Sequence, residues 1–148
     1  MRTIGIVSGG FDPIHVGHIY YIESAKKLCD KLIVGVNSDA WLERKKGKFF
    51  QTFTERYRIV MALRAVDYVT AFNDDDGTAR ELIKLVQNME RGASKFIFMN
   101  GGDRTEQNVP EMDVPDVEFM FGVGGGIKMN SSSKILRRWG STQLEEQT

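Results

Sequence analysis

Short apolar runs alternate along the chain with longer segments in which apolar and polar residues follow a helical period. Runs rich in β-branched and aromatic residues predict five strands. These runs occupy residues 3–9, 31–37, 67–72, 95–101 and 117–122. The first, second and fourth runs are apolar at almost every position, which is typical of strands buried on both faces of a parallel sheet.

Three intervening segments have the apolar periodicity of amphipathic helices, at residues 16–28, 54–65 and 78–89. Thr54 can cap the second helix, and Asp75 and Asp76 can cap the third. The alternation predicts an α/β fold, a Rossmann-like three-layer sandwich with a central five-stranded, mainly parallel sheet. Ligands of such sheets bind beyond the carboxyl ends of the strands.

The length of 148 residues and the apolar fraction of 41% suit one domain with a single core. We expect this domain to span residues 1–140 and the polar residues 141–148 to form a disordered tail. Basic and acidic residues each number 20, so no overall charge favours nucleic acid or a membrane as a partner. The single cysteine and the lack of a long apolar segment predict a soluble, cytoplasmic protein.

Both histidines of the chain, His15 and His18, lie in "SGGFDPIHVGH", between the first predicted strand and the first predicted helix. Unpaired amides and the positive end of the helix dipole make such a helix start a natural phosphate site. Gly17 removes a side chain that could obstruct a ligand, and each imidazole can donate a hydrogen bond to phosphoryl oxygens. In the alternative interpretation, His15 caps a turn and His18 packs on the helix.

Two further segments can bind anions. Asn130 or Ser131 can cap a C-terminal helix whose next hydroxyls and amides face outward, and "ERKKGK" at residues 43–48 supplies four cations. Their simpler interpretations are a plain helix cap and a solvated basic loop.

Three stretches resemble one known family. "GGFDPIHVGH" resembles the HxGH signature of the nucleotidyltransferase superfamily, which includes cytidylyltransferases and small adenylyltransferases. The segments around "KLIVGVNSDAWLERKKGK" and "ERYRIVMALRAVDYV" are similar to glycerol-3-phosphate cytidylyltransferase and to the nucleotidyltransferase domain of the bifunctional ADP-heptose synthesis enzyme. "NSSSKIL" resembles the serine-rich motif near the end of these proteins. The expected order of the motifs makes the resemblance far more specific than a lone glycine motif.

The resemblance implies that a substrate phosphate attacks the α-phosphorus of a nucleoside triphosphate and displaces pyrophosphate. It implies catalytic roles for His15, His18 and Lys46. It implies nucleotide binding by Gly9, Gly10, Phe11, Asp12, Gly17, Lys45, Gly102, Asp103, Ser131, Ser132 and Ser133. It further implies substrate binding by Arg56 and Lys128.

Some of these roles have alternatives. Arg56 could instead brace the basic loop, and Asp103 could merely fix the turn in which it lies. No protein residue is assigned to a metal, because the adjacent carboxylates of "NDDDG" rarely converge on one ion. Mg²⁺ is expected to arrive with the triphosphate, and the resemblance implies a homodimer.

Three functional hypotheses remain. The first is transfer of CMP from CTP to a small phosphorylated alcohol or sugar, and the second is the same chemistry with ATP, as in ADP-heptose or flavin-nucleotide synthesis. The third is a catalytically silent nucleotide-binding protein on the same fold. "GGDRT" favours the heptose type, whereas the short chain favours the stand-alone cytidylyltransferases, so CTP is preferred slightly.

Overall fold

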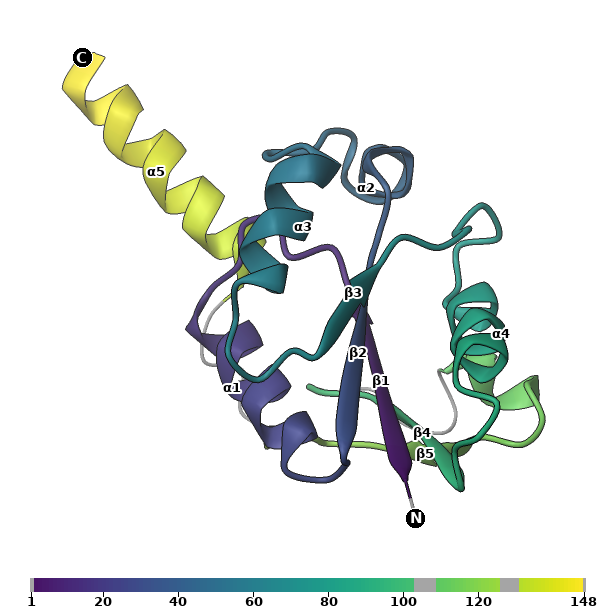
Figure 1. The fold of residues 1–148 in the computed structure, drawn as a ribbon. Helices are drawn as coiled ribbons and strands as arrows, with labels where there is room; N and C mark the ends of the chain where they lie inside the picture. Colours follow the sequence, from purple (N-terminus) through teal and green to yellow (C-terminus); the bar gives the residue numbers. More distant parts are fainter. Residues whose placement is uncertain (1, 103–108, 126–130, 148) are drawn as a thin grey trace.

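Parallel strands form one sheet in the order β3-β2-β1-β4-β5 in the computed structural model (Figure 1). The structure describes residues 2–102, 109–125 and 131–147, with side chains described up to residue 140. The strands are β1 (Thr3–Gly9), β2 (Lys31–Val36), β3 (Tyr68–Thr70), β4 (Lys95–Met99) and β5 (Glu118–Met120). All four pairings between neighbouring strands are parallel, so the predicted α/β fold is confirmed and its mainly parallel sheet is entirely parallel in the described residues.

Helices cover both faces of this sheet (Figure 1). They are α1 (Val16–Lys26), α2 (Asp39–Lys46), α3 (Phe53–Met61), α4 (Arg80–Met89) and α5 (Ser132–Gln147), with a short 3₁₀ helix η1 (Pro110–Asp113). Helices α1 and α3 lie on one face, whereas α4 lies on the other. The Lys45–Lys46 pair, expected in a loop, belongs to the last turn of α2.

Side chains alternate between two cores along the central strands. In β1, Val7 belongs to the core beneath α1 and α3, whereas Ile6 belongs to the core beneath α4. Gly35 of β2 lets α4 approach the sheet closely, because a Cβ there would lie 2.4 Å from a methyl carbon of Leu82. The strand runs that looked apolar throughout in the sequence therefore fill both cores.

The N-cap of helix α3 lies two residues before the predicted cap. Thr52 is the N-cap, and its hydroxyl oxygen accepts a hydrogen bond of 3.4 Å from the amide of Glu55. Thr54, predicted as the cap, lies inside the first turn. Both threonines have side chains suited to capping, and only Thr52 has the glutamate three residues later that accompanies many N-caps.

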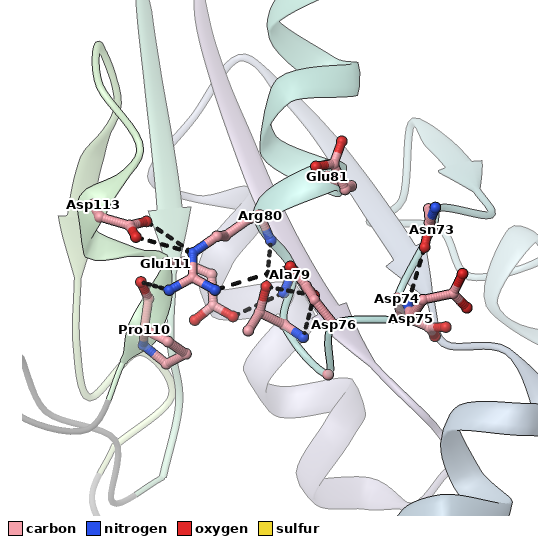
Figure 2. Close-up of polar contacts among 12 residues, drawn as sticks. Asn73, Asp74, Asp75, Asp76, Ala79, Arg80, Glu81, Pro110, Glu111 and Asp113 are labelled. Carbon is pink, nitrogen blue, oxygen red and sulfur yellow. Dashed lines mark hydrogen bonds and ion pairs between the residues drawn. The ribbon is translucent and has the colours of Figure 1, made fainter.

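The start of α4 also differs from the prediction (Figure 2). The Asp76 carboxylate accepts hydrogen bonds from the amide and the hydroxyl of Thr78, each at 2.8 Å, and so closes the turn before the helix. The N-cap is Ala79, whose amide donates to the Glu111 carboxylate at 2.8 Å. Asp75 does not cap this helix; its own amide donates to a neighbouring asparagine side chain. A carboxylate from 32 residues further along the chain thus takes the place of the predicted local cap.

Helix α5 continues to Gln147 and projects away from the sandwich (Figure 1). The backbone of residues 141–147 is therefore helical, although the sequence there has no apolar period; the domain boundary at residue 140 stays a prediction. Within the described residues, no helix combines the length and apolar character that crossing a membrane requires.

Asp67 joins β2 to the start of β3 and to α1. Its carboxylate accepts hydrogen bonds from the Leu32 amide at 2.8 Å and from the Lys26 ammonium group at 2.6 Å. Its own amide donates to the Leu32 carbonyl at 3.0 Å. Partial burial alone would raise the pKa of Asp67, but the bonds from Lys26 and Leu32 outweigh it and lower that pKa.

Because folding lowers the pKa of Asp67, its ionised carboxylate stabilises the folded state at pH values above the usual pKa near 3.8. This stabilisation is lost as the pH falls through the lowered pKa. Asp67→Asn should therefore reduce the free energy of unfolding at pH 7 by up to about 1 kcal/mol, since the ion pair is partly exposed to solvent. Denaturant unfolding should show this difference shrinking as the pH falls below 3.8 through the lowered pKa, and also in about 1 M salt. A difference that stayed constant with pH would contradict the ionic origin.

Candidate active site

A pocket of about 590 Å³ opens at the carboxyl ends of β1 and β4. Its polar lining comes from the starts of α1 and α5, the end of α2 and the segments after β4 and β5. Its lining residues are Ser8, His15, Gly17, His18, Tyr20, Tyr21, Lys45, Lys46, Phe98, Met99, Asn100, Gly101, Gly102, Glu111, Val123, Gly124, Gly125, Ser131, Ser132, Ser133 and Arg137. The sheet topology thus places the pocket where ligands of parallel sheets bind.

The two histidines form a reciprocal cap at the start of α1. His15 is the N-cap, and its Nδ1 accepts a hydrogen bond of 3.1 Å from the Gly17 amide. In return, Nδ1 of His18 accepts one of 3.2 Å from the His15 amide. The imidazole rings stack with their centroids 3.8 Å apart, and the Phe11 ring contacts His18 edge-on. Two side chains of the same type are therefore fixed side by side at the positive end of this helix.

These bonds determine which nitrogen of each ring carries a proton. A neutral imidazole has one N–H, and a nitrogen that accepts a hydrogen bond cannot carry it. Because Nδ1 accepts in both rings, Nε2–H is the donor in both neutral histidines. Capping and phosphate binding, treated as alternatives in the sequence, are thus compatible, since they use opposite nitrogens of the same ring.

The start of α5 meets the same loop. The Ser131 hydroxyl accepts a hydrogen bond of 3.0 Å from the Lys134 amide, which confirms one of the two caps predicted for this helix. The buried Ser132 hydroxyl donates to the Pro13 carbonyl at 2.7 Å and so ties α5 to the segment before His15. Two helix N-termini therefore converge on one pocket, and both favour bound anions.

Lysines at the end of α2 supply positive charge. Lys45 and Lys46 both line the pocket, and the Lys45 ammonium group also lies 4.5 Å above the Trp41 ring. Gly47 is the C-cap of this helix, and its φ of 85° is in the left-handed region that glycine adopts at low cost. The cations are therefore held on a helix with a defined end.

The Gly9–Asp12 loop supports the pocket from behind. None of its residues is among those that line the pocket in the described part of the chain. A Cβ at Gly10 would lie 2.9 Å from a Leu42 methyl carbon, and Phe11 is buried in the core beneath α1. The buried Asp12 carboxylate accepts hydrogen bonds of 2.6 Å from the amides of Phe50 and Gln51.

Arg56 lies behind the pocket, with no exposed surface. Its guanidinium group donates to the carbonyls of Gly10 and Asn37, at 2.9 and 2.7 Å, and to the Gln51 carbonyl at 2.9 Å. It also forms an ion pair of 2.7 Å with Asp39. Three segments around the site thus meet on one side chain, which favours the bracing role over direct substrate contact.

The structure accordingly separates the predicted site residues into three groups. Those that line the pocket are His15, Gly17, His18, Lys45, Lys46, Gly102, Ser131, Ser132 and Ser133. Those behind it are Gly9, Gly10, Phe11, Asp12 and Arg56. Asp103 and Lys128 lie outside the described residues. The roles assigned to these residues stay predictions.

Several lining residues were missed by the sequence analysis. Tyr21 is held by a hydrogen bond of 2.5 Å from its hydroxyl to the Met99 carbonyl, while Asn100 and Glu111 are buried polar residues. Tyr20 and Arg137 read as ordinary surface positions of helices. No local pattern marks these residues, because the sheet brings them together from distant parts of the chain.

Metal-ligating side chains are sparse in the described part of the pocket. The part of the chain that the structure describes has no group of three or more histidine, cysteine, aspartate or glutamate residues placed to bind a metal. Glu111 is the one carboxylate among the lining residues of the described chain. This lining fits an ion that is coordinated chiefly by phosphate oxygens.

Comparison with protein families agrees with this geometry. Residues 6–116 match the family described as cytidylyltransferase-like. This range contains the end of β1, the histidine loop, the α2 lysines and strands β2, β3 and β4. The chain belongs to this family. This membership confirms the family resemblance found in the sequence.

Relatives of this cytidylyltransferase-like chain include the bifunctional protein HldE of Syntrophotalea carbinolica, which is 34% identical over 93% of the chain. The chain spans 28% of that relative's length and the same share of HldE from Geobacter metallireducens. A lipopolysaccharide core biosynthesis protein from Thermoplasma volcanium superimposes with a TM-score of 0.60, at 24% identity, over 82% of this chain and 96% of its own.

A bifunctional NMN adenylyltransferase/ADP-ribose pyrophosphatase from Francisella tularensis, solved with AMP and a manganese ion, has a TM-score of 0.67 at 14% identity. The match covers 93% of this chain and 41% of that one. At these identities the likeness to both structures shows a shared fold.

Proposed function

We propose that this chain transfers a nucleoside monophosphate from a nucleoside triphosphate to a small phosphorylated sugar or alcohol and releases pyrophosphate. The observation that carries the proposal is the stacked pair of histidines at the start of α1, in one pocket with the start of α5 and the lysines of α2. These groups supply neutral donors, helix dipoles and cations, which phosphoryl transfer needs.

In the proposed reaction, a phosphate oxygen of the acceptor attacks the α-phosphorus. A new P–O bond forms while the bond from the α-phosphorus to its bridging oxygen breaks, and that electron pair leaves with pyrophosphate. An acceptor phosphate dianion already holds the attacking electron pair, so no general base is required. The Nε2–H groups of His15 and His18 stabilise negative charge on the pentavalent phosphorus.

The leaving pyrophosphate requires positive surroundings. We assign it to the start of α5, where the Ser131 cap and Ser133 lie, and to Lys45 and Lys46. A divalent ion, expected as Mg²⁺, would be held by the phosphates themselves and would neutralise their charge. The protein's own contribution is then to position the phosphates and to stabilise the charge that develops.

The nucleobase is the finer part of the proposal. The preference for CTP that was drawn from the sequence rested on chain length. Chain length is a weaker argument here, because the chain spans only part of the length of its relatives. Similarity to HldE proteins over 93% of the chain and the resemblance of "NGGD" to the ADP-heptose enzymes support ATP. We therefore favour adenylyl transfer, with cytidylyl transfer as the second candidate.

Thermal unfolding with ATP, CTP, GTP and UTP, each with Mg²⁺, tests this choice. A nucleotide at one hundred times its Kd should add about 2.7 kcal/mol to the free energy of unfolding. We expect ATP to raise the Tm most. A selective increase with CTP would restore the second candidate, and no increase with any of the four would contradict nucleotide binding at this pocket.

The homodimer implied by the family resemblance also remains a proposal. Light scattering at micromolar concentration would test it, and a monomeric mass would contradict it.

A further inference from the structure

The pocket extends across both faces of the sheet at its carboxyl edge. Val7 and Met99 point into the core beneath α1, whereas Ile6 and Phe98 point into the core beneath α4. Phe98 nevertheless lines the pocket together with Tyr21 of α1. The pocket therefore has an α1 side and an α4 side.

The α1 side has the features of a nucleotide site. Cβ atoms built on Gly101 and Gly124 would lie 2.9 and 3.1 Å from atoms of Tyr21, so their backbones lie close against α1. Bare backbone beside an aromatic residue suits a flat base and a ribose. The helix starts that favour phosphates, those of α1 and α5, adjoin this side.

The α4 side contains Glu111, a carboxylate that the proposed mechanism does not use. Glu111 lies in η1, is 6% exposed and lines the pocket. One of its oxygens accepts the Ala79 amide at 2.8 Å, which anchors the side chain to the start of α4 (Figure 2). Within the described residues the carboxylate makes no other hydrogen bond, so an oxygen remains that can accept from a ligand.

The helix η1 that carries Glu111 is itself fixed in place. Arg80 donates to the Asp113 carboxylate at 2.9 Å and to the Pro110 carbonyl at 2.9 Å (Figure 2). Glu111 is thus held between two residues that are bound to the first turn of α4. A side chain held in this way loses little conformational entropy when it binds a ligand.

The pocket consequently has opposite charges among its lining groups. Lys45, Lys46 and Arg137 are cationic, whereas Glu111 is anionic. A carboxylate repels a phosphate and accepts hydrogen bonds from hydroxyl groups, and such O–H···O⁻ bonds are among the strong ones. The arrangement suits a molecule that carries a phosphate at one end and hydroxyl groups at the other.

We propose that Glu111 binds hydroxyl groups of the acceptor and selects a polyhydroxylated phosphate, such as a sugar phosphate, over acceptors without hydroxyl groups. The inference rests on the proposed nucleotidyl transfer and adds the residue that recognises the acceptor. The acceptor phosphate points toward His15 and His18, and its hydroxyl groups point toward the α4 side.

Glu111→Gln is the decisive variant. The amide oxygen can still accept from Ala79, which preserves the start of α4, while the amide group presented to the ligand becomes a donor. We expect the KM for a sugar 1-phosphate to rise about 10-fold or more in pyrophosphate-release assays. The KM for the nucleoside triphosphate and the Tm should stay near those of the wild type. Glu118→Gln, the same substitution at an exposed position of β5 that does not line the pocket, is the matched control and should leave both KM values unchanged.

Each other outcome overturns the inference in a recognisable way. A rise in the nucleotide KM alone would place Glu111 at the base, where it would accept from an exocyclic amine. Unchanged KM values would reduce Glu111 to a cap of α4, as would equal changes in Glu118→Gln. Wild-type protein that releases pyrophosphate only with hydroxyl-free phosphates would overturn the inference while leaving the proposed function intact. No release with any acceptor would overturn both.

Discussion

His18→Ala is expected to lower kcat by about 10²-fold or more, because it removes one of the two Nε2–H donors that we propose to stabilise the reacting phosphorus. The Nδ1 atom of His18 accepts the His15 amide, so this hydrogen bond is lost as well. A first-turn bond of this kind contributes about 1 kcal/mol or less to stability. Steady-state kinetics and denaturant unfolding together should therefore show a large loss of turnover with a small loss of stability.

His15→Asn separates catalysis from capping at the neighbouring position. Asparagine is a preferred N-cap, and its side-chain oxygen can accept the Gly17 amide as Nδ1 of His15 does. The substitution removes the outward imidazole N–H and the ring stacked on His18, and keeps the cap. The expected result is a wild-type Tm with kcat lowered about 10²-fold.

Two results would contradict this account of the histidines. Turnover near that of the wild type in either variant would remove the role in the transition state. A loss of turnover that merely followed the loss of stability, with His15→Asn behaving as wild type, would show that the pair serves only to cap α1.

Arg56→Met is expected to give the largest loss of stability among substitutions near the site. The fully buried guanidinium group holds the carbonyls of Gly10, Asn37 and Gln51, which lose their donors together when it is removed. A buried carbonyl left without a donor, as that of Asn37 would be, costs about 1–3 kcal/mol, and the part-buried carbonyls of Gly10 and Gln51 cost less, so we expect a total loss of about 3 kcal/mol in the free energy of unfolding.

Arg58→Ala, two positions further along α3 and exposed, is the control and should change stability by less than about 0.5 kcal/mol. Arg56→Lys should recover only part of the loss, because one ammonium group cannot reproduce the geometry of a guanidinium fork. A loss below about 1 kcal/mol in Arg56→Met would contradict the bracing role. Wild-type stability with a raised acceptor KM would instead support substrate contact.

Much of the fold could be predicted because its determinants are local. Alternation of apolar runs with helical periods identified the five strands and the parallel sheet, and the histidine loop at a strand end located the pocket. Residues with a local role, such as the Ser131 cap, could also be predicted from the sequence.

The rest depended on tertiary contacts that carry no local signal. The sequence showed Arg56 as one of several arginines on an amphipathic helix, and only the fold buries it beneath the Gly10 loop. Similarly, Glu111 lies in a segment without periodicity, and its bond to Ala79 spans 32 residues. The glycines before Phe11 correctly indicated that another group lies close to the backbone. At Gly10, however, a Cβ would meet the Leu42 side chain rather than the pocket.

Pyrophosphate release by the wild-type protein tests the central claim most directly. The reaction would contain ATP, Mg²⁺ and a sugar 1-phosphate, with parallel reactions that omit the acceptor, replace ATP by CTP or use His18→Ala. We predict release that requires the acceptor, is fastest with ATP and falls about 10²-fold or more in His18→Ala. Absence of acceptor-dependent release with every nucleoside triphosphate across a panel of sugar and alditol phosphates would contradict the claim.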